Sequence, residues 1–159
     1  MIDVKVTLEE ALGFVVDTIA KAQRPLLFMQ VVAKQILADS RAAFDNEADP
    51  EDGTPWAPLT EKYAARKERQ FPGKGTLVAT DTMRRSMDVD AGFDDAGLGY
   101  ARGYVRPSTG GRNRRSADVY AAAHQFGNPD TNLPARPFMA LTPDSIDRLN
   151  ELHAAWYLE

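Results

Sequence analysis

The sequence contains no cysteine and only two histidines among its 159 residues. Without cysteine the chain forms no disulfide and has no thiolate to bind a metal or attack a substrate, which fits synthesis in a reducing cytoplasm. No stretch reaches the roughly 18 apolar residues that a membrane span needs. The start, "MIDVKVTLEE", has acidic residues where an export signal has basic ones. We therefore expect neither a membrane partner nor export.

The scarcity of histidine limits nucleophilic catalysis, which needs a base beside its nucleophile. His153 falls next to the apolar stripe of a predicted C-terminal helix, so we interpret it as a helix-surface residue. His124 lies in "YAAAHQFG", and no G-x-S-x-G turn supplies a serine for it. We interpret His124 as a structural residue and do not expect an enzyme. A small hydrolase that uses His124 is the least favoured alternative.

Motifs for metals and phosphates are also missing. There is no H-E-x-x-H, and the acid-rich "DNEADPED" lacks the ligand spacing and the closing glutamate of a calcium loop. The turn "FPGKGT" lacks the spacing of a phosphate-binding loop and follows no strand. We predict no metal and no cofactor.

The composition that remains is typical of one globular domain over residues 1–159, with 43% apolar and 26% charged residues. The net charge of −4 is unevenly distributed. Residues 1–61 carry 5 basic and 11 acidic groups, residues 62–115 carry 12 and 6, and residues 116–159 carry 2 and 6. Such an alternation suits contacts between neighbouring copies. Solvated faces or a surface for nucleic acid remain alternatives.

Helical spacing of apolar residues predicts two N-terminal helices, over 7–23 and 25–44, because Pro25 ends or restarts a helix. A proline-rich loop over 45–59 follows, and we expect Trp56 to anchor it to the core. Further helices are predicted over 60–70, 77–87 and 142–158.

Alternation of apolar and polar residues predicts strands in "SMDVDAGF", "GLGYARGYV" and "VYAAAHQFG". A long basic loop over 106–118 separates the last two. The predicted fold is therefore α+β, with two N-terminal helices, a small antiparallel sheet of three to four strands and a C-terminal helix.

The basic loop offers Arg112, Arg114 and Arg115 to a partner. Arginines in a flexible loop neutralise phosphates, so a nucleic-acid-binding accessory protein is an alternative function. No aromatic residue is interleaved with these arginines to stack on bases, which favours an acidic protein surface as the partner.

Four segments carry a resemblance to a known family: "DGTPWAPLT", "KGTLVATDTMRRSM", "DVYAAAHQFG" and "LPARPFMAL". In this order they resemble the phage virion morphogenesis, or tail completion, family. Its pattern has a G-x-x-W-x-P-L loop, then L-x-x-T/S-G-x-L-x-x-S, Y-A-x-x-H-Q-x-G and P-A/R-R-P-F-L-G-L. The chain departs from this pattern at Asp81, where the family has glycine, and at Met83, where it has leucine.

The resemblance implies a structural protein of the virion tail or neck, assembled in the host cytoplasm. It implies tail completion or head–tail joining as a tail-terminator or neck ring, with a homohexamer expected from the sixfold tail tube. The implied partners are further copies, the tail tube or sheath protein and a head-side connector protein, with DNA in the lumen a further contact for the basic loop.

The segment from Tyr120 to Phe138 is then best interpreted as a brace between sheet and final helix. In it Gln125 belongs to the family motif, and Gly127 permits a turn. Pro137 holds the chain extended. We expect Arg136 to pair with an acid and Phe138 to enter the core.

Overall fold

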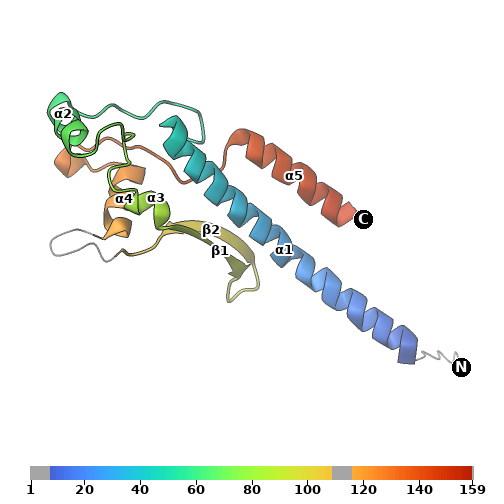
Figure 1. Ribbon diagram of the computed structural model, residues 1–159. Coiled ribbons are helices and arrows are strands. Elements are labelled where there is room, and N and C mark those ends of the chain that lie inside the picture. Colours follow the sequence, from blue (N-terminus) through green and yellow to red (C-terminus); the bar gives the residue numbers. More distant parts are fainter. Residues whose placement is uncertain (1–7, 109–115, 159) are drawn as a thin grey trace, which may run out of the picture.

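The computed structural model describes residues 8–108 and 116–158, with side chains placed for Leu12, 25–108 and 116–156. Figure 1 shows one long helix with a two-stranded sheet and the C-terminal helix beside it, while the other helices lie near the C-terminal end of the long helix. The elements follow in the order α1 (Leu8–Asn46), α2 (Glu61–Gln70), α3 (Thr82–Arg85), β1 (Met87–Phe93), β2 (Gly99–Val105), α4 (Ala117–Phe126), η1 (Pro129–Thr131) and α5 (Pro143–Leu158). The α+β class is confirmed, and so are the helices predicted over 60–70 and 142–158.

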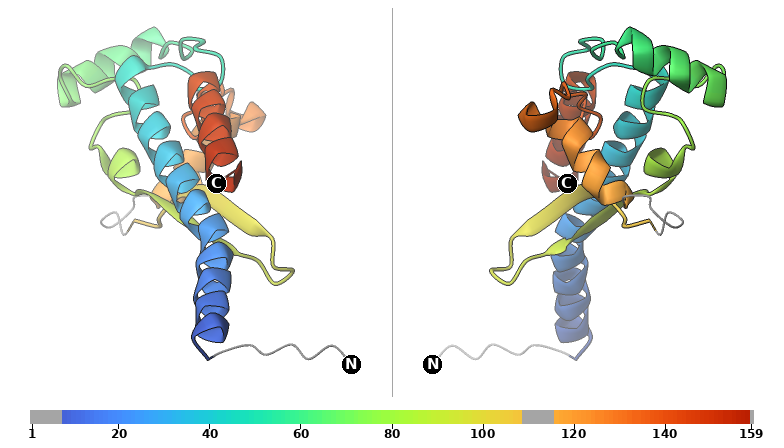
Figure 2. Two further views of the ribbon diagram at one scale, coloured as in Figure 1. Left: turned by 90° about the vertical axis from the view of Figure 1, so that its right-hand side faces the viewer. Right: turned by 90° about the vertical axis from the view of Figure 1, so that its left-hand side faces the viewer.

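The prediction of two N-terminal helices is wrong, because α1 is continuous over 39 residues and contains Pro25. A proline inside a helix removes one backbone hydrogen bond, and the helix formers on both sides of it outweigh that loss here. The first half of α1 extends beyond the rest of the chain, as Figures 1 and 2 show. The helix thus has a half that packs and a half that projects.

The predicted hairpin is confirmed. Strands β1 and β2 pair antiparallel, from Met87 opposite Val105 to Phe93 opposite Gly99. One face of the ribbon lies on α1, and the absence of a side chain at Gly103 makes this approach possible. A Cβ atom there would lie 2.8 Å from the Met139 sulfur and 2.9 Å from a methyl carbon of Ile36.

The third predicted strand is wrong, because "ADVYAAAHQF" forms helix α4. Its buried residues are Ala117 and Ala121, four positions apart and therefore on one helical face. The three consecutive alanines favour a helix intrinsically, and this preference outweighs the alternating pattern. The sheet consequently has two strands within the described residues. The helix predicted over 77–87 shrinks to the single turn of α3.

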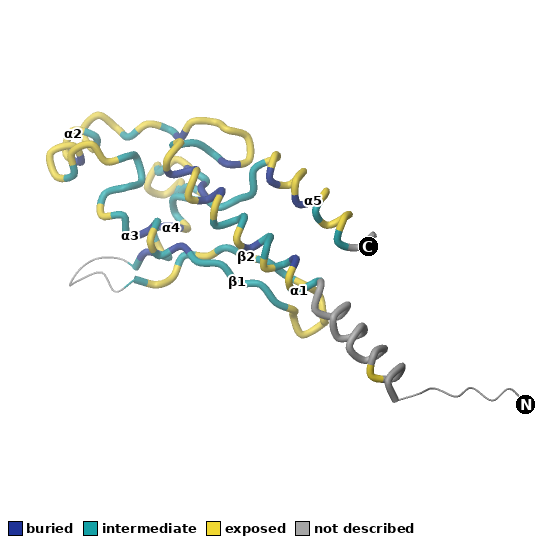
Figure 3. Tube along the Cα trace, turned by 45° about the vertical axis from the view of Figure 1, so that its right-hand side comes forward, coloured by how far each residue is buried: buried dark blue, intermediate teal, exposed yellow. Residues whose placement is uncertain are grey.

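The core lies where the second half of α1 meets the loops, as the buried segments in Figure 3 show. It is one cluster of apolar side chains contributed by six different parts of the chain: Ala43, Phe44, Trp56, Met83, Met87, Ala121 and Phe138. Helix α5 packs on the same half of α1. Its first turn is capped by the Thr142 hydroxyl, which accepts a hydrogen bond from the Ser145 N–H at 3.2 Å.

Candidate assembly interface

Trp56 joins the loop over 45–59 to the end of the chain. Only 8% of the residue is exposed, and its ring packs edge-on against Phe44. The indole N–H donates to the Pro137 carbonyl at 2.6 Å. The predicted anchoring of the loop by Trp56 is confirmed, and the hydrogen bond ties it directly to the "ARPF" segment.

Arg136 is 2% exposed and holds the same loop from the opposite direction. Its Nε donates to the Ala57 carbonyl at 2.7 Å and a terminal nitrogen donates to the Pro58 carbonyl at 3.1 Å. The expected pairing with an acid is therefore wrong: within the described residues the guanidinium is held by carbonyl oxygens. Burial lowers the pKa of Arg136 from its ordinary value.

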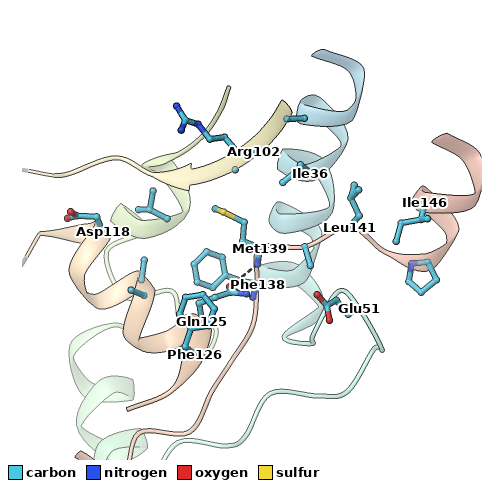
Figure 4. Close-up of a pocket in the computed structure, with 17 residues that line it drawn as sticks. Ile36, Glu51, Arg102, Asp118, Gln125, Phe126, Phe138, Met139, Leu141 and Ile146 are labelled. Atoms are coloured by element: carbon cyan, nitrogen blue, oxygen red, sulfur yellow. Dashed lines mark hydrogen bonds between the residues drawn. The ribbon is translucent and has the colours of Figure 1, made fainter. Parts of the chain in front are cut away.

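Gln125 explains why an amide follows the histidine in the motif. Its side-chain oxygen accepts hydrogen bonds from the N–H groups of Phe138 at 3.0 Å and Met139 at 3.1 Å, drawn as dashed lines in Figure 4. Gly127 ends α4 with a φ of 76°, as the predicted turn requires. Phe138 lies in the core, as expected. Four residues, Trp56, Gln125, Arg136 and Phe138, thus tie the loop over 45–59, helix α4 and the "ARPF" segment together. From here on, the brace means these four residues.

His124 lies on helix α4 and not on a strand. Its carbonyl accepts the Arg136 N–H at 2.6 Å, and the residue lines a cleft of about 1080 Å³ beside α2. Burial, and then the charge of Arg136, lower the pKa of His124 below 6.5. The ring is therefore neutral at pH 7, and no serine, threonine or acid is hydrogen-bonded to its buried Nδ1 among the described residues.

A groove lies between β2 and α4, and we name it the β2–α4 groove (Figure 4). It has a volume of about 930 Å³. Its lining comes from all parts of the fold: Ile36, Glu51, Ala101, Arg102, Gly103, Val105, Asp118, Ala121, Ala122, Gln125, Phe126, Phe138, Met139, Ala140, Leu141, Pro143 and Ile146. Phe138 and Met139 on the floor of the groove are held in place by their hydrogen bonds to Gln125 of the brace.

Large apolar side chains are exposed around this groove. Phe126 is 80% exposed at the end of α4, Val119 is 54% exposed on the same helix and Ile146 is 45% exposed on α5. Sequence analysis missed this groove, because it depends on α4 being a helix and on residues more than a hundred positions apart.

The outer face of the hairpin carries a second feature that sequence analysis missed. Asp88 accepts hydrogen bonds from Arg106 and Tyr104, and Asp90 pairs with Arg102 at 2.9 Å. The bonds from Arg106 lower the pKa of Asp88. These arginines are neutralised by neighbouring acids. The predicted contact residues Arg112, Arg114 and Arg115 lie outside the described residues.

Two further observations concern the described part of the chain alone. No group of three histidine, aspartate or glutamate residues there is arranged to hold a metal ion. No helix there is long and apolar enough to cross a membrane.

Fold and surface together define a small α+β protein with a braced C-terminal motif and an open apolar groove. Residues 4–157 match the model of the phage virion morphogenesis family, and the chain belongs to that family. It is similar to the putative capsid assembly protein G of Escherichia phage Mu, with 29% identity over 132 residues, 79% of this chain and 74% of that protein. An uncharacterized protein of Methanocaldococcus jannaschii is 29% identical over 84 residues, 53% of each chain. No solved structure matches. Family membership supports a structural role in virion assembly.

Proposed function

We propose that this protein completes the phage tail or joins it to the head by binding other proteins, as one subunit of a homohexameric ring in the neck. The ring would sit at the head-proximal end of the tail tube and contact the tube or sheath on one side and a head-side connector on the other. Family membership over nearly the whole chain supports the assembly role. The name of the phage Mu relative, which refers to the capsid, supports a position near the head.

The observation that carries a binding function is the exposure of two apolar side chains that line the β2–α4 groove, Phe126 at 80% and Ile146 at 45%. Single exposed apolar residues are ordinary, but a group that borders an apolar groove marks an interaction site. A subunit in a ring buries such surface against its neighbours.

A ring requires two different surfaces on each subunit, because a head-to-tail contact repeats and closes. The projecting half of α1 and the β2–α4 groove lie on separate parts of the molecule (Figure 2). Two separate surfaces suit such a contact better than a twofold dimer, in which one surface meets itself.

Light scattering coupled to size exclusion, followed by negative-stain imaging, tests this function. We expect a species of six copies, ring-shaped in projection, that binds the end of purified tail tubes. A chain that stays monomeric at high concentration and binds DNA in a salt-sensitive way would instead favour the nucleic-acid-binding alternative.

A further inference from the structure

The outer edge of β2 forms one wall of the β2–α4 groove. The N–H of Arg106 donates to the Ser86 carbonyl at 2.7 Å and that of Asp94 donates to the Leu98 carbonyl at 2.9 Å. In an antiparallel pair, residues that exchange hydrogen bonds alternate with residues that do not. The backbone groups of residues 100, 102 and 104 therefore also point toward β1. Those of Gly99, Ala101, Gly103 and Val105 point the other way.

These outward groups have no strand to pair with in the described part of the chain, where the sheet consists of β1 and β2 alone. Ala101, Gly103 and Val105 all line the groove. Asp118, on the facing helix, also lines it and has a buried Oδ1 with no hydrogen-bond partner among the described residues. The groove thus combines an unpaired strand edge, an unsatisfied acceptor and an apolar floor. This combination suits an extended segment that adds as a strand.

Residues 1–7, "MIDVKVT", have the sequence of such a segment. Ile2, Val4 and Val6 alternate with Asp3 and Lys5, so a strand would place its apolar side chains on one face and its charged side chains on the other. Beside β2, the apolar face would meet the floor formed by Ile36 and Met139. The charged face would lie on the side of Arg102, whose side chain is 65% exposed.

The segment cannot reach the groove of its own chain. Ile36 lines the groove, and Leu8 precedes it by 28 positions on the same helix, which corresponds to about 42 Å at about 1.5 Å per residue. Seven extended residues span only about 23 Å at about 3.3 Å each. Figure 1 shows the first turn of α1 at the far end of the helix from α4.

We infer that residues 2–6 of one copy add as a third strand to the free edge of β2 in the next copy. The inference rests on the proposed ring and names the contact that closes it. Each chain donates one segment and receives another through a different surface. The contact is therefore head-to-tail, and it propagates from subunit to subunit until the ring closes.

Disulfide cross-linking of the full chain tests the contact, since the natural sequence has no cysteine to interfere. The double variant Asp3→Cys/Arg102→Cys places one thiol on the donated segment and one on the receiving strand. Mild oxidation should give a ladder of covalent multimers up to six chains. Each single variant has one thiol and can give no covalent species larger than a dimer.

Two proline substitutions supply a matched pair, because Ala91 and Ala101 face each other across the ribbon. Their N–H groups point to opposite outer edges. Ala101→Pro removes a donor from the edge in the groove and should abolish the ladder in the double variant. Ala91→Pro alters the other edge and should leave the ladder intact. Both keep the β1–β2 hydrogen bonds, and circular dichroism checks that each variant folds.

Hydrogen exchange in the assembled protein gives an independent reading. The amides of Ala101, Gly103 and Val105 should be protected in the ring and exchange at least tenfold faster in Ala101→Pro, where residue 101 itself has no amide. A ladder that persists in Ala101→Pro, or a double variant that forms rings but gives no ladder on oxidation, would overturn the contact and leave the ring standing. Protection that appears only after tail-tube protein is added would assign the groove to that protein and also overturn the contact. A chain that stays monomeric would overturn the ring itself.

Discussion

Trp56 contributes to stability in two separable ways, through its ring and through one hydrogen bond. The ring fills the core beside Phe44, and the indole N–H satisfies the carbonyl of Pro137. Trp56→Ala should lower the free energy of unfolding by about 3–5 kcal/mol, the usual cost of removing a large aromatic side chain from a core. Trp56→Phe keeps most of the packing but loses the hydrogen bond and should cost about 1–2 kcal/mol. Urea denaturation measures both: an unchanged Trp56→Phe would show that the hydrogen bond carries no separate weight, and equal losses in the two variants would show that the packing of the ring carries none.

Asp81 occupies the position where the family pattern has glycine, and its backbone explains why. Its φ is 60°, in the left-handed region that side chains with a Cβ atom avoid. Its Oδ2 accepts a hydrogen bond from the Arg85 Nε at 3.1 Å on the surface, which offsets part of that cost.

Substitution at this position should follow backbone preference. We expect Asp81→Gly to be more stable than Asp81→Ala by about 1–2 kcal/mol, because alanine keeps the backbone strain that glycine avoids. The comparison of two variants that both lack the carboxylate removes the ion pair from consideration. Equal midpoints in chemical denaturation would contradict this account of the turn.

His124 should make folding sensitive to mild acid. Burial lowers the pKa of its ring in the folded chain below the ordinary 6.5. The unfolded chain then binds the proton more strongly, so stability is full above about pH 6.5 and is lost as the pH falls below it. The thermal midpoint should fall between pH 7 and pH 5, and less steeply in His124→Gln. Titration of the ring by NMR checks the cause directly, and a midpoint at or above 6.5 would refute it.

At the scale of elements, Pro25 shows how a local pattern can fit two structures. A proline is favourable in the first turn of a helix and costs about 3 kcal/mol in an interior, and the residues around Pro25 suit either position. Since α1 is continuous, Pro25→Ala should restore a backbone hydrogen bond and raise the free energy of unfolding by about 1–3 kcal/mol. Lys34→Ala, at an exposed site of the same helix, should change it by less than about 0.5 kcal/mol. A Pro25→Ala variant no more stable than the natural chain would indicate that the helix is interrupted there.

The sequence predicted those elements whose local signals agree with one another. The hairpin and α5 have clear periodicity and turn residues, and both formed as predicted. In α4 two signals conflict, because every second residue from Tyr120 to Phe126 suits a strand while the alanines suit a helix. Packing of Ala117 and Ala121 decides the outcome, and packing is not visible in a local pattern.

The brace was predictable in its members but not in all its contacts. Family motifs pointed to Trp56, Gln125, Arg136 and Phe138. They did not indicate that Arg136 would bind the carbonyls of Ala57 and Pro58 in place of an acid. Those partners lie almost eighty positions away in a loop, and any exposed acid would have fitted the sequence equally well. The pairing of Asp88 with Arg106 likewise could not be predicted without knowledge of the strand register.

At the scale of the whole molecule, the chain separates a fixed body from surfaces that it leaves uncovered. The brace, the second half of α1 and α5 build the body. The projecting half of α1 and the rim of the β2–α4 groove contribute little to that body. We therefore expect substitutions at the rim to weaken assembly while leaving the stability of the single subunit almost unchanged. A subunit that folds first and associates afterward behaves in this way.

Phe126 offers the sharpest test of this separation. At 80% exposure its ring makes few contacts within the chain, so Phe126→Ser should change the free energy of unfolding by less than about 0.5 kcal/mol. In the hexameric assembly the Phe126 side chain would be buried against a neighbouring subunit. Its loss should weaken association by at least tenfold, which is the usual effect of removing an aromatic residue from an interface. Leu98→Ser is the matched control, since Leu98 is 67% exposed at the hairpin tip, away from the groove. Light scattering over a dilution series measures association, and urea denaturation measures folding. Equal weakening by both substitutions would mean that general surface apolarity drives assembly, whereas weakening by Phe126→Ser alone would assign the contact to the groove.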